Sequence, residues 1–118
     1  MKFEQSGLED KIVPFADFRE IMEEAGFDAQ WDYERCTYDY KILDEVKDDV
    51  YYFRFPGVVH EGEFPKESSK VRLLQPYLGK HYYPHGVEYD EVFPERIVEK
   101  CKKKIEQVRE KLSASAVG

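Results

Sequence analysis

The clearest pattern in the chain is a helical stripe near its C-terminus. From Val98 to Leu112, apolar residues recur in steps of three and four, the spacing that places side chains on one face of an α-helix. Pro94 and Glu95 suit the start of this helix, because proline gives up only an N–H that would have no partner there and a carboxylate favours the positive helix end. The pattern predicts a long helix that docks through one face, followed by a frayed tail over residues 113–118.

A second, shorter helical pattern lies near the N-terminus. Its apolar residues recur at helical spacing behind Pro14, and Gly26 follows as a residue suited to ending a helix. The apolar positions are Phe15, Phe18, Ile21, Met22 and Ala25. We therefore predict a helix over about residues 15–25.

Between the two helices the apolar period changes to two, which is typical of β-strands. Residues 36–43 and 50–55 both alternate, and a polar stretch over 44–49 separates them. They are predicted to form a hairpin. The alternation changes parity near Glu34, which indicates either a β-bulge or a break between strands.

Further short strands are expected at residues 3–8, 58–62 and 71–74, with a bend of the chain at Pro56–Gly57. The element order predicts a single α+β domain over residues 1–118. It would hold an antiparallel sheet of about five strands, with the short N-terminal and the long C-terminal helix packed on one face. This arrangement resembles the helix-grip and TBP-like folds, which often leave a cavity between the long helix and the sheet.

Composition and charge narrow the class of protein. The chain carries 25 Asp and Glu against 18 Lys and Arg, for a net charge of −7, although residues 95–118 alone carry +3. An acidic chain is not typical of nucleic-acid-binding proteins. No stretch approaches the apolar length of a membrane span or a secretory signal, so we expect a cytoplasmic protein without a membrane partner. Two cysteines, Cys36 and Cys101, are expected to be small buried side chains.

The candidate chemistry is concentrated in residues 78–89. This stretch combines two histidines, three tyrosines and a proline between glycines, and it predicts a shaped loop. Because tyrosine and histidine join an apolar body to a polar tip, such a loop suits contact with a partner or ligand. A rigid loop whose side chains only satisfy the backbone would have the same sequence. The candidate residues here are His81, Tyr82, Tyr83, His85, Glu88 and Tyr89.

Two other interpretations of this stretch stay open. His81 and His85 with Glu88 are the residue types of a zinc-like site, although Pro84 argues against the helix on which a His-x3-His pair usually lies. A histidine beside a carboxylate also suits acid–base catalysis near neutral pH. No nucleophile motif accompanies it, and no cofactor is predicted.

Aromatic residues also fall on both faces of the predicted strands. Trp31 and Tyr33 lie on one parity, Tyr38 lies on the other, and Tyr51 and Tyr52 are adjacent. Since an exposed aromatic face favours association, we expect the second face to be covered by a ligand or by a second copy of the chain. The leading hypothesis is a non-enzymatic binding or protein-interaction module, a possible homodimer or binder of a small apolar or aromatic ligand. The alternative is a small enzyme or metal-binding protein.

Two stretches carry a family resemblance. Residues 30–39, which read Gln-Trp-Asp-Tyr-Glu-Arg-x-Thr-Tyr-Asp, and residues 78–89 resemble the YugN-like family of small proteins from Bacillus and its relatives. The opening residues 1–9 are also similar, so the resemblance covers nearly the whole chain. It implies a stand-alone bacterial cytoplasmic protein. The family brings no established activity, catalytic residue or cofactor that would identify a site.

Overall fold

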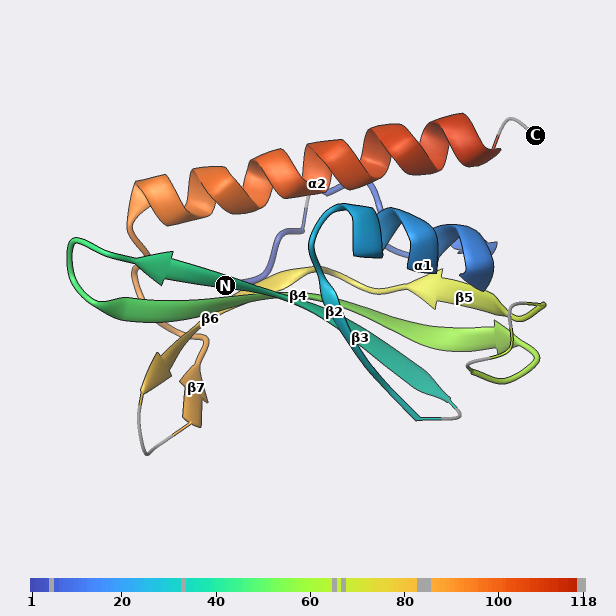
Figure 1. The fold of residues 1–118 in the computed structure, drawn as a ribbon, viewed down its shortest axis with the longest axis horizontal. Coiled ribbons are helices and arrows are strands. Elements are labelled where there is room, and N and C mark those ends of the chain that lie inside the picture. Colours follow the sequence, from blue (N-terminus) through green and yellow to red (C-terminus); the bar gives the residue numbers. More distant parts are fainter. Residues whose placement is uncertain (5, 33, 65, 67, 83–85, 117–118) are drawn as a thin grey trace.

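A computed structural model describes the chain except for residues 5, 33, 65, 67, 83–85 and 117–118, and it describes side chains up to residue 113. Within these residues the chain forms an antiparallel sheet and two helices (Figure 1). The elements are β1 (Ile12–Pro14), α1 (Phe15–Glu24), β2 (Asp28–Trp31), β3 (Arg35–Asp44), β4 (Asp49–Glu61), β5 (Lys70–Leu73), β6 (Tyr77–Tyr82), β7 (Gly86–Glu88) and α2 (Glu95–Ala116).

The sheet is built around β4. One edge of β4 pairs with β3, which pairs in turn with β2. The other edge pairs with two strands end to end: β6 along residues 50–54 and β5 along residues 57–61. β7 extends the sheet beyond β6, and β1 extends it beyond β5. The predicted α+β class and antiparallel sheet are confirmed, with seven strands in the described chain where about five were expected.

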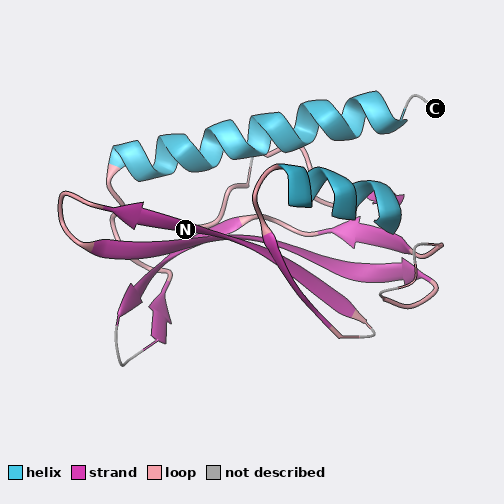
Figure 2. Ribbon diagram, viewed as in Figure 1, coloured by secondary structure: helices cyan, strands magenta, loops and turns pink. Residues whose placement is uncertain are grey.

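Both helices cover the same face of the sheet, as predicted (Figure 2). The core lies between the helices and the sheet. The α2 stripe is buried as its spacing requires, while alternate residues of β3 and β4 face it from the sheet. Buried core residues include Phe15, Phe18, Met22, Cys36, Tyr38, Tyr51, Phe53, Phe55, Cys101, Ile105, Val108 and Leu112. Neither helix in the described part of the chain has the length and apolar character to cross a bilayer.

The predicted bend at Pro56–Gly57 is wrong, because β4 continues through both residues. Gly57 lies opposite Cys36 of β3 and Leu73 of β5. A Cβ at this position would lie only 2.6 Å from Val71 Cγ2. The glycine thus permits close packing of the three strands and does not end one.

The N-terminal strand was predicted in the wrong place. The described residues among 3–8 form no strand; Lys2 makes an isolated bridge with Tyr77, and β1 follows at residues 12–14. Phe3 and Leu8 are nevertheless buried. Their apolar side chains therefore reflect packing in the core and not membership of a strand. At the other end, α2 continues to Ala116, which places the first residues of the expected frayed tail in the helix.

Within residues 78–89, residues 78–82 and 86–88 form strands where a loop was predicted, and residues 83–85 lie outside the described part of the chain. Most of this stretch is a hairpin in which β6 and β7 pair through Lys80 with Glu88, His81 with Val87 and Tyr82 with Gly86. In Figure 1 this hairpin projects away from the helices, as does the end of the β2–β3 hairpin. Of the candidate residues in these two strands, Tyr82 and Glu88 therefore lie on one face of the strand pair and His81 lies on the other.

Candidate functional site

The β6–β7 hairpin separates the predicted site residues onto two faces. Leu78 lies opposite Phe53 in the core, so the even-numbered residues of β6 share the helix-bearing face. Tyr82 has that parity. His81 has the opposite parity and lies on the face of the sheet that neither helix covers.

On this helix-free face, Arg54 is the centre of a group of polar and aromatic side chains. Its Nη1 donates a hydrogen bond of 2.7 Å to the Tyr89 hydroxyl. Its Nε lies 3.3 Å from Asp39 Oδ1, and its guanidinium carbon lies 5.6 Å from the centre of the Tyr52 ring. We name this group the Arg54 cluster; it comprises Asp39, Tyr52, Arg54, Tyr77, His81 and Tyr89.

Aromatic contacts complete the cluster. Tyr52 and His81 meet edge to face with ring centres 5.9 Å apart, and Tyr77 and Tyr89 do so at 5.3 Å. Gly79 lies beneath the Tyr89 ring, where a Cβ would come within 2.6 Å of the ring atom Cε1. The absence of a side chain at Gly79 thus lets Tyr89 lie flat on β6 and reach Arg54.

The electrostatics of the cluster reflect partial burial. Burial raises the pKa of the Asp39 carboxyl, and the charge of Arg54 opposes this rise. Burial also raises the pKa of Tyr89, which keeps its hydroxyl neutral at physiological pH. Asp39 Oδ1 and Arg54 Nε are buried atoms without a hydrogen-bond partner among the described residues. The cluster therefore holds an ion pair whose hydrogen-bonding capacity is incompletely used.

Tyr82, by contrast, belongs to a structural network on the opposite face. Its hydroxyl donates to Glu91, and Lys80 Nζ lies 4.8 Å from its ring centre and 3.4 Å from Asp49 Oδ2. The hydrogen bond with Tyr82, together with Asp49, raises the pKa of Lys80. These contacts tie the hairpin to β4 and to the segment before α2.

The alternative metal set consisted of His81, His85 and Glu88, and the hairpin separates two of these residues. His81 and Glu88 lie on opposite faces, because Glu88 shares the parity of its partner Lys80. Tyr33, Tyr83 and His85 lie outside the described residues. Among those that are described, no three His, Cys, Asp or Glu side chains are grouped as metal ligands would be.

Trp31 lies away from the Arg54 cluster. It ends β2 opposite Cys36, so it shares the helix-bearing face, and its ring meets that of Phe15 at 6.1 Å. It is 41% exposed and borders a shallow hollow of about 210 Å³ at the tip of the β2–β3 hairpin. His81 and Tyr89 thus belong to one cluster on the helix-free face, whereas Trp31 lies on the helix-bearing face.

Sequence reasoning missed three members of the cluster, Asp39, Arg54 and Tyr77, as functional candidates, whereas Tyr52 was among the strand aromatics expected to need a cover. The signal was present in β4, where Tyr52 and Arg54 alternate with the core residues Tyr51, Phe53 and Phe55. An arginine between two inward-facing phenylalanines must point to the other face. What the alternation did not show is that β6 lies beside β4 and brings Tyr77 and His81 to the same surface.

Comparison with known proteins agrees with this architecture. The model of the YugN-like family matches residues 4–113. The chain belongs to the YugN-like family. A family relative, the uncharacterized protein YlbA of Bacillus subtilis (strain 168), is 40% identical over 112 residues, which cover 92% of each chain.

A crystal structure of another member, the uncharacterized conserved protein YugN from Geobacillus kaustophilus HTA426, shares the fold. Its sequence is 38% identical, the match covers 100% of this chain and 99% of that one, and the TM-score is 0.87. The predicted membership of the YugN-like family is confirmed. Like the resemblance on which it was based, it brings no assigned catalytic or binding residue.

Proposed function

We propose that this YugN-like protein is a non-enzymatic binding module and that the Arg54 cluster is its contact surface. The observation that supports this is a half-buried group of aromatic and charged side chains on the sheet face that carries no helix. Tyrosine and arginine in such settings often dominate the binding energy of protein interfaces. The Arg54 and Asp39 side chains keep 26% and 13% of their surface exposed, so polar groups of an incoming surface can reach the ion pair.

The partner that we propose is a second copy of the same chain, in the cytoplasm. The two charges at the centre of the cluster, on Arg54 and Asp39, are opposite and cancel. Two copies of this surface can therefore meet at the cluster without electrostatic repulsion between these residues. A two-fold arrangement also uses one patch on both subunits, which is the commonest form of association among soluble proteins. The net negative charge of the chain opposes association of two copies. Because salt screens this repulsion, we expect association to strengthen at higher salt.

The test is the molar mass in solution of the wild type and of a variant carrying Tyr52→Ala and His81→Ala. Size-exclusion chromatography with light scattering at micromolar concentration should give a dimer for the wild type and a monomer for the variant. Both side chains are partly exposed, so the thermal midpoint should change little. Trp31→Ala, an exposed aromatic residue on the other hairpin, is the matched control and should stay dimeric. A monomeric wild type refutes self-association, and a dimeric Tyr52/His81 variant refutes this surface.

A further inference from the structure

A second surface, separate from the Arg54 cluster, lies where α2 passes the edge of β3. A groove of about 320 Å³ opens there. Its lining comes from two short stretches, one on each element: Tyr40, Lys41, Ile42 and Leu43 from β3, and Lys100, Lys103, Lys104 and Gln107 from α2. The α2 residues recur at helical spacing, so they form one stripe that faces the strand.

The edge of the sheet is open along this groove. β2 pairs with β3 only as far as Asp39, opposite Asp28, and the chain then turns away toward α1. Residues 40–44 of β3 therefore have a strand neighbour on the β4 side alone within the described chain (Figure 1). Backbone N–H and C=O groups on such an edge are available to a ligand.

The charge of the groove is unusual for this molecule. Acidic residues outnumber basic ones in the chain by 25 to 18, yet four lysines and no carboxylate line the groove. Lys104 is already engaged: its Nζ donates to the Ala25 carbonyl at 2.6 Å and lies 4.4 Å from the centre of the Tyr40 ring. Lys41, Lys100 and Lys103 are exposed and make no ion pair with any residue that the structure describes.

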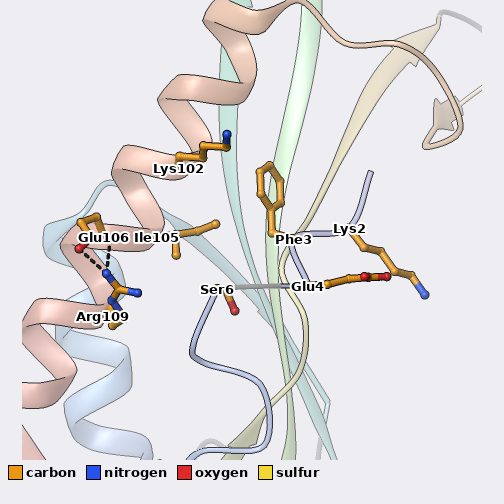
Figure 3. Close-up of a pocket in the computed structure, with 8 residues that line it drawn as sticks. All are labelled: Lys2, Phe3, Glu4, Ser6, Lys102, Ile105, Glu106 and Arg109. Carbon is orange, nitrogen blue, oxygen red and sulfur yellow. Dashed lines mark hydrogen bonds and ion pairs between the residues drawn. The ribbon is translucent and has the colours of Figure 1, made fainter.

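A neighbouring groove on the other side of α2 provides a contrast. It holds about 470 Å³ and is lined by Lys2, Phe3, Glu4, Ser6, Lys102, Ile105, Glu106 and Arg109 (Figure 3). There the cations have anionic neighbours, since Arg109 pairs with Glu106 and Lys102 Nζ lies 3.7 Å from Glu99 Oε1. That groove is lined by two carboxylates and three cations, whereas the β3–α2 groove is lined by four lysines and no carboxylate.

The floor of the β3–α2 groove is apolar. Ile42 is buried and Tyr40 presents its ring beneath Lys104, both on the face toward α2, whereas Leu43 is 56% exposed and borders the groove at the open edge of the strand. We propose that this groove binds a small amphiphilic anion, a carboxylate or phosphate carried on a short alkyl or aromatic body. The anionic head meets the amines of Lys100 and Lys103 on α2, and the apolar body lies against the Tyr40 ring and along the open β3 edge at Ile42 and Leu43. The volume matches the lower end of small-molecule pockets.

A second copy of the chain is a poor occupant of this groove. A symmetric pairing of two β3 edges would bring both sets of lysines together, and like charges across an interface are unfavourable. The excess of amines without an ion-pair partner and the exposed leucine are explained together by a ligand that is both anionic and apolar.

The experiment is an NMR titration of the ¹⁵N-labelled protein with four probes: octyl phosphate, octanoate, octanol and inorganic phosphate. The octyl anions are expected to shift the amide signals of residues 40–43 and 100–107 in a saturable manner. Octanol, which lacks the head, and inorganic phosphate, which lacks the body, should each bind at least about tenfold more weakly. The stronger of the two octyl anions identifies the head group.

Two variants and a control on the same helix make the test specific. Lys100→Gln with Lys103→Gln should weaken the octyl anions about tenfold or more, since each lost amine removes a charge-assisted contact. Leu43→Ser should weaken the octyl anions and leave inorganic phosphate unchanged. Lys102→Gln, which removes a neighbouring exposed lysine outside the groove, should bind as the wild type does. Equal affinity for octanol and the octyl anions, or unchanged binding by the Lys100/Lys103 variant, overturns the proposal.

Discussion

At the scale of single residues, the two thiols show how the core determines reactivity. Cys36 lies in β3 opposite Gly57 of β4, and Cys101 lies on the buried face of α2. Neither thiol is exposed to solvent. Burial raises the pKa of each thiol to about 12, because the low-dielectric core disfavours the thiolate. Four lysines near Cys101 in sequence do not change this, since three of them are exposed and the fourth, Lys104, bonds the Ala25 carbonyl.

We expect both thiols to be unreactive toward Ellman's reagent in the folded protein at pH 8. The thiolate is the nucleophile. At pH 8 too little of each thiol is ionised, and the sulfur is too deeply buried, for the reagent to react. In guanidinium chloride, two thiols per chain should react within the mixing time. Rapid reaction of one thiol in the native protein would show that its helix or strand opens locally.

At the scale of elements, close packing of strands requires glycine at two places. Gly57 permits β3, β4 and β5 to approach one another, and Gly79 permits Val87 and Tyr89 to lie against β6. Gly79 links the fold to the candidate site, because the hydroxyl of the Tyr89 side chain that lies on Gly79 accepts the hydrogen bond of Arg54.

Gly79→Ala is expected to destabilise the protein by about 1–3 kcal/mol, the usual cost of inserting a methyl group into a close-packed site. The new Cβ would meet Val87 Cγ1 at 2.4 Å, so the β7 side of the hairpin must move. Urea unfolding measures the loss of stability. Val92→Ala, at a fully exposed position, is the control and should stay within about 0.5 kcal/mol of the wild type. An unchanged midpoint for Gly79→Ala would contradict the packing described here.

At the scale of the whole molecule, polar contacts fix the long helix on the sheet and on α1. Arg96 in the first turn of α2 pairs with Asp44 at the end of β3, and Asp44 is almost fully buried. Further along the helix, Lys104 bonds the carbonyl that follows α1, and Lys111 Nζ lies 3.0 Å from Glu24 Oε2. The apolar stripe supplies most of the docking energy, and these contacts select the orientation of the helix.

The Asp44–Arg96 pair predicts a dependence of stability on pH. Burial opposes ionisation of Asp44, but the hydrogen bond and charge of Arg96, together with hydrogen bonds from the Val46 and Lys47 N–H groups, outweigh it and hold the pKa of Asp44 below its ordinary value of 3.8. A carboxyl with a lowered folded-state pKa stabilises the fold above its unfolded pKa, and this stabilisation is lost as the pH falls. Asp44→Asn should therefore lower the thermal midpoint at pH 7, and its difference from the wild type should shrink as the pH falls below 3.8.

Thermal unfolding followed by circular dichroism across this pH range measures the effect. Glu45→Gln removes a carboxylate at the next, exposed position and serves as the control. It should change neither the midpoint at pH 7 nor its dependence on pH. A difference between Asp44→Asn and the wild type that stays constant at low pH would refute the assignment.

The sequence by itself determined the elements whose pattern is local. The helical spacing from Val98 to Leu112 predicted α2 and its buried face, and the alternation of residues 36–55 predicted the β3–β4 hairpin. The family was also recognisable from short motifs. These predictions succeeded because the spacing of apolar residues along a helix or strand follows directly from which face is buried.

Only the tertiary structure decided which surfaces the candidate residues share. Pro84 and the neighbouring glycines suggested a loop, but pairing with β4, which is distant in sequence, makes β6 a strand and sends His81 and Tyr82 to opposite faces. Likewise, the lysines of α2 line a groove only because the helix lies beside the open edge of β3. Strand neighbours and helix placement depend on contacts between distant segments, and no local period encodes them.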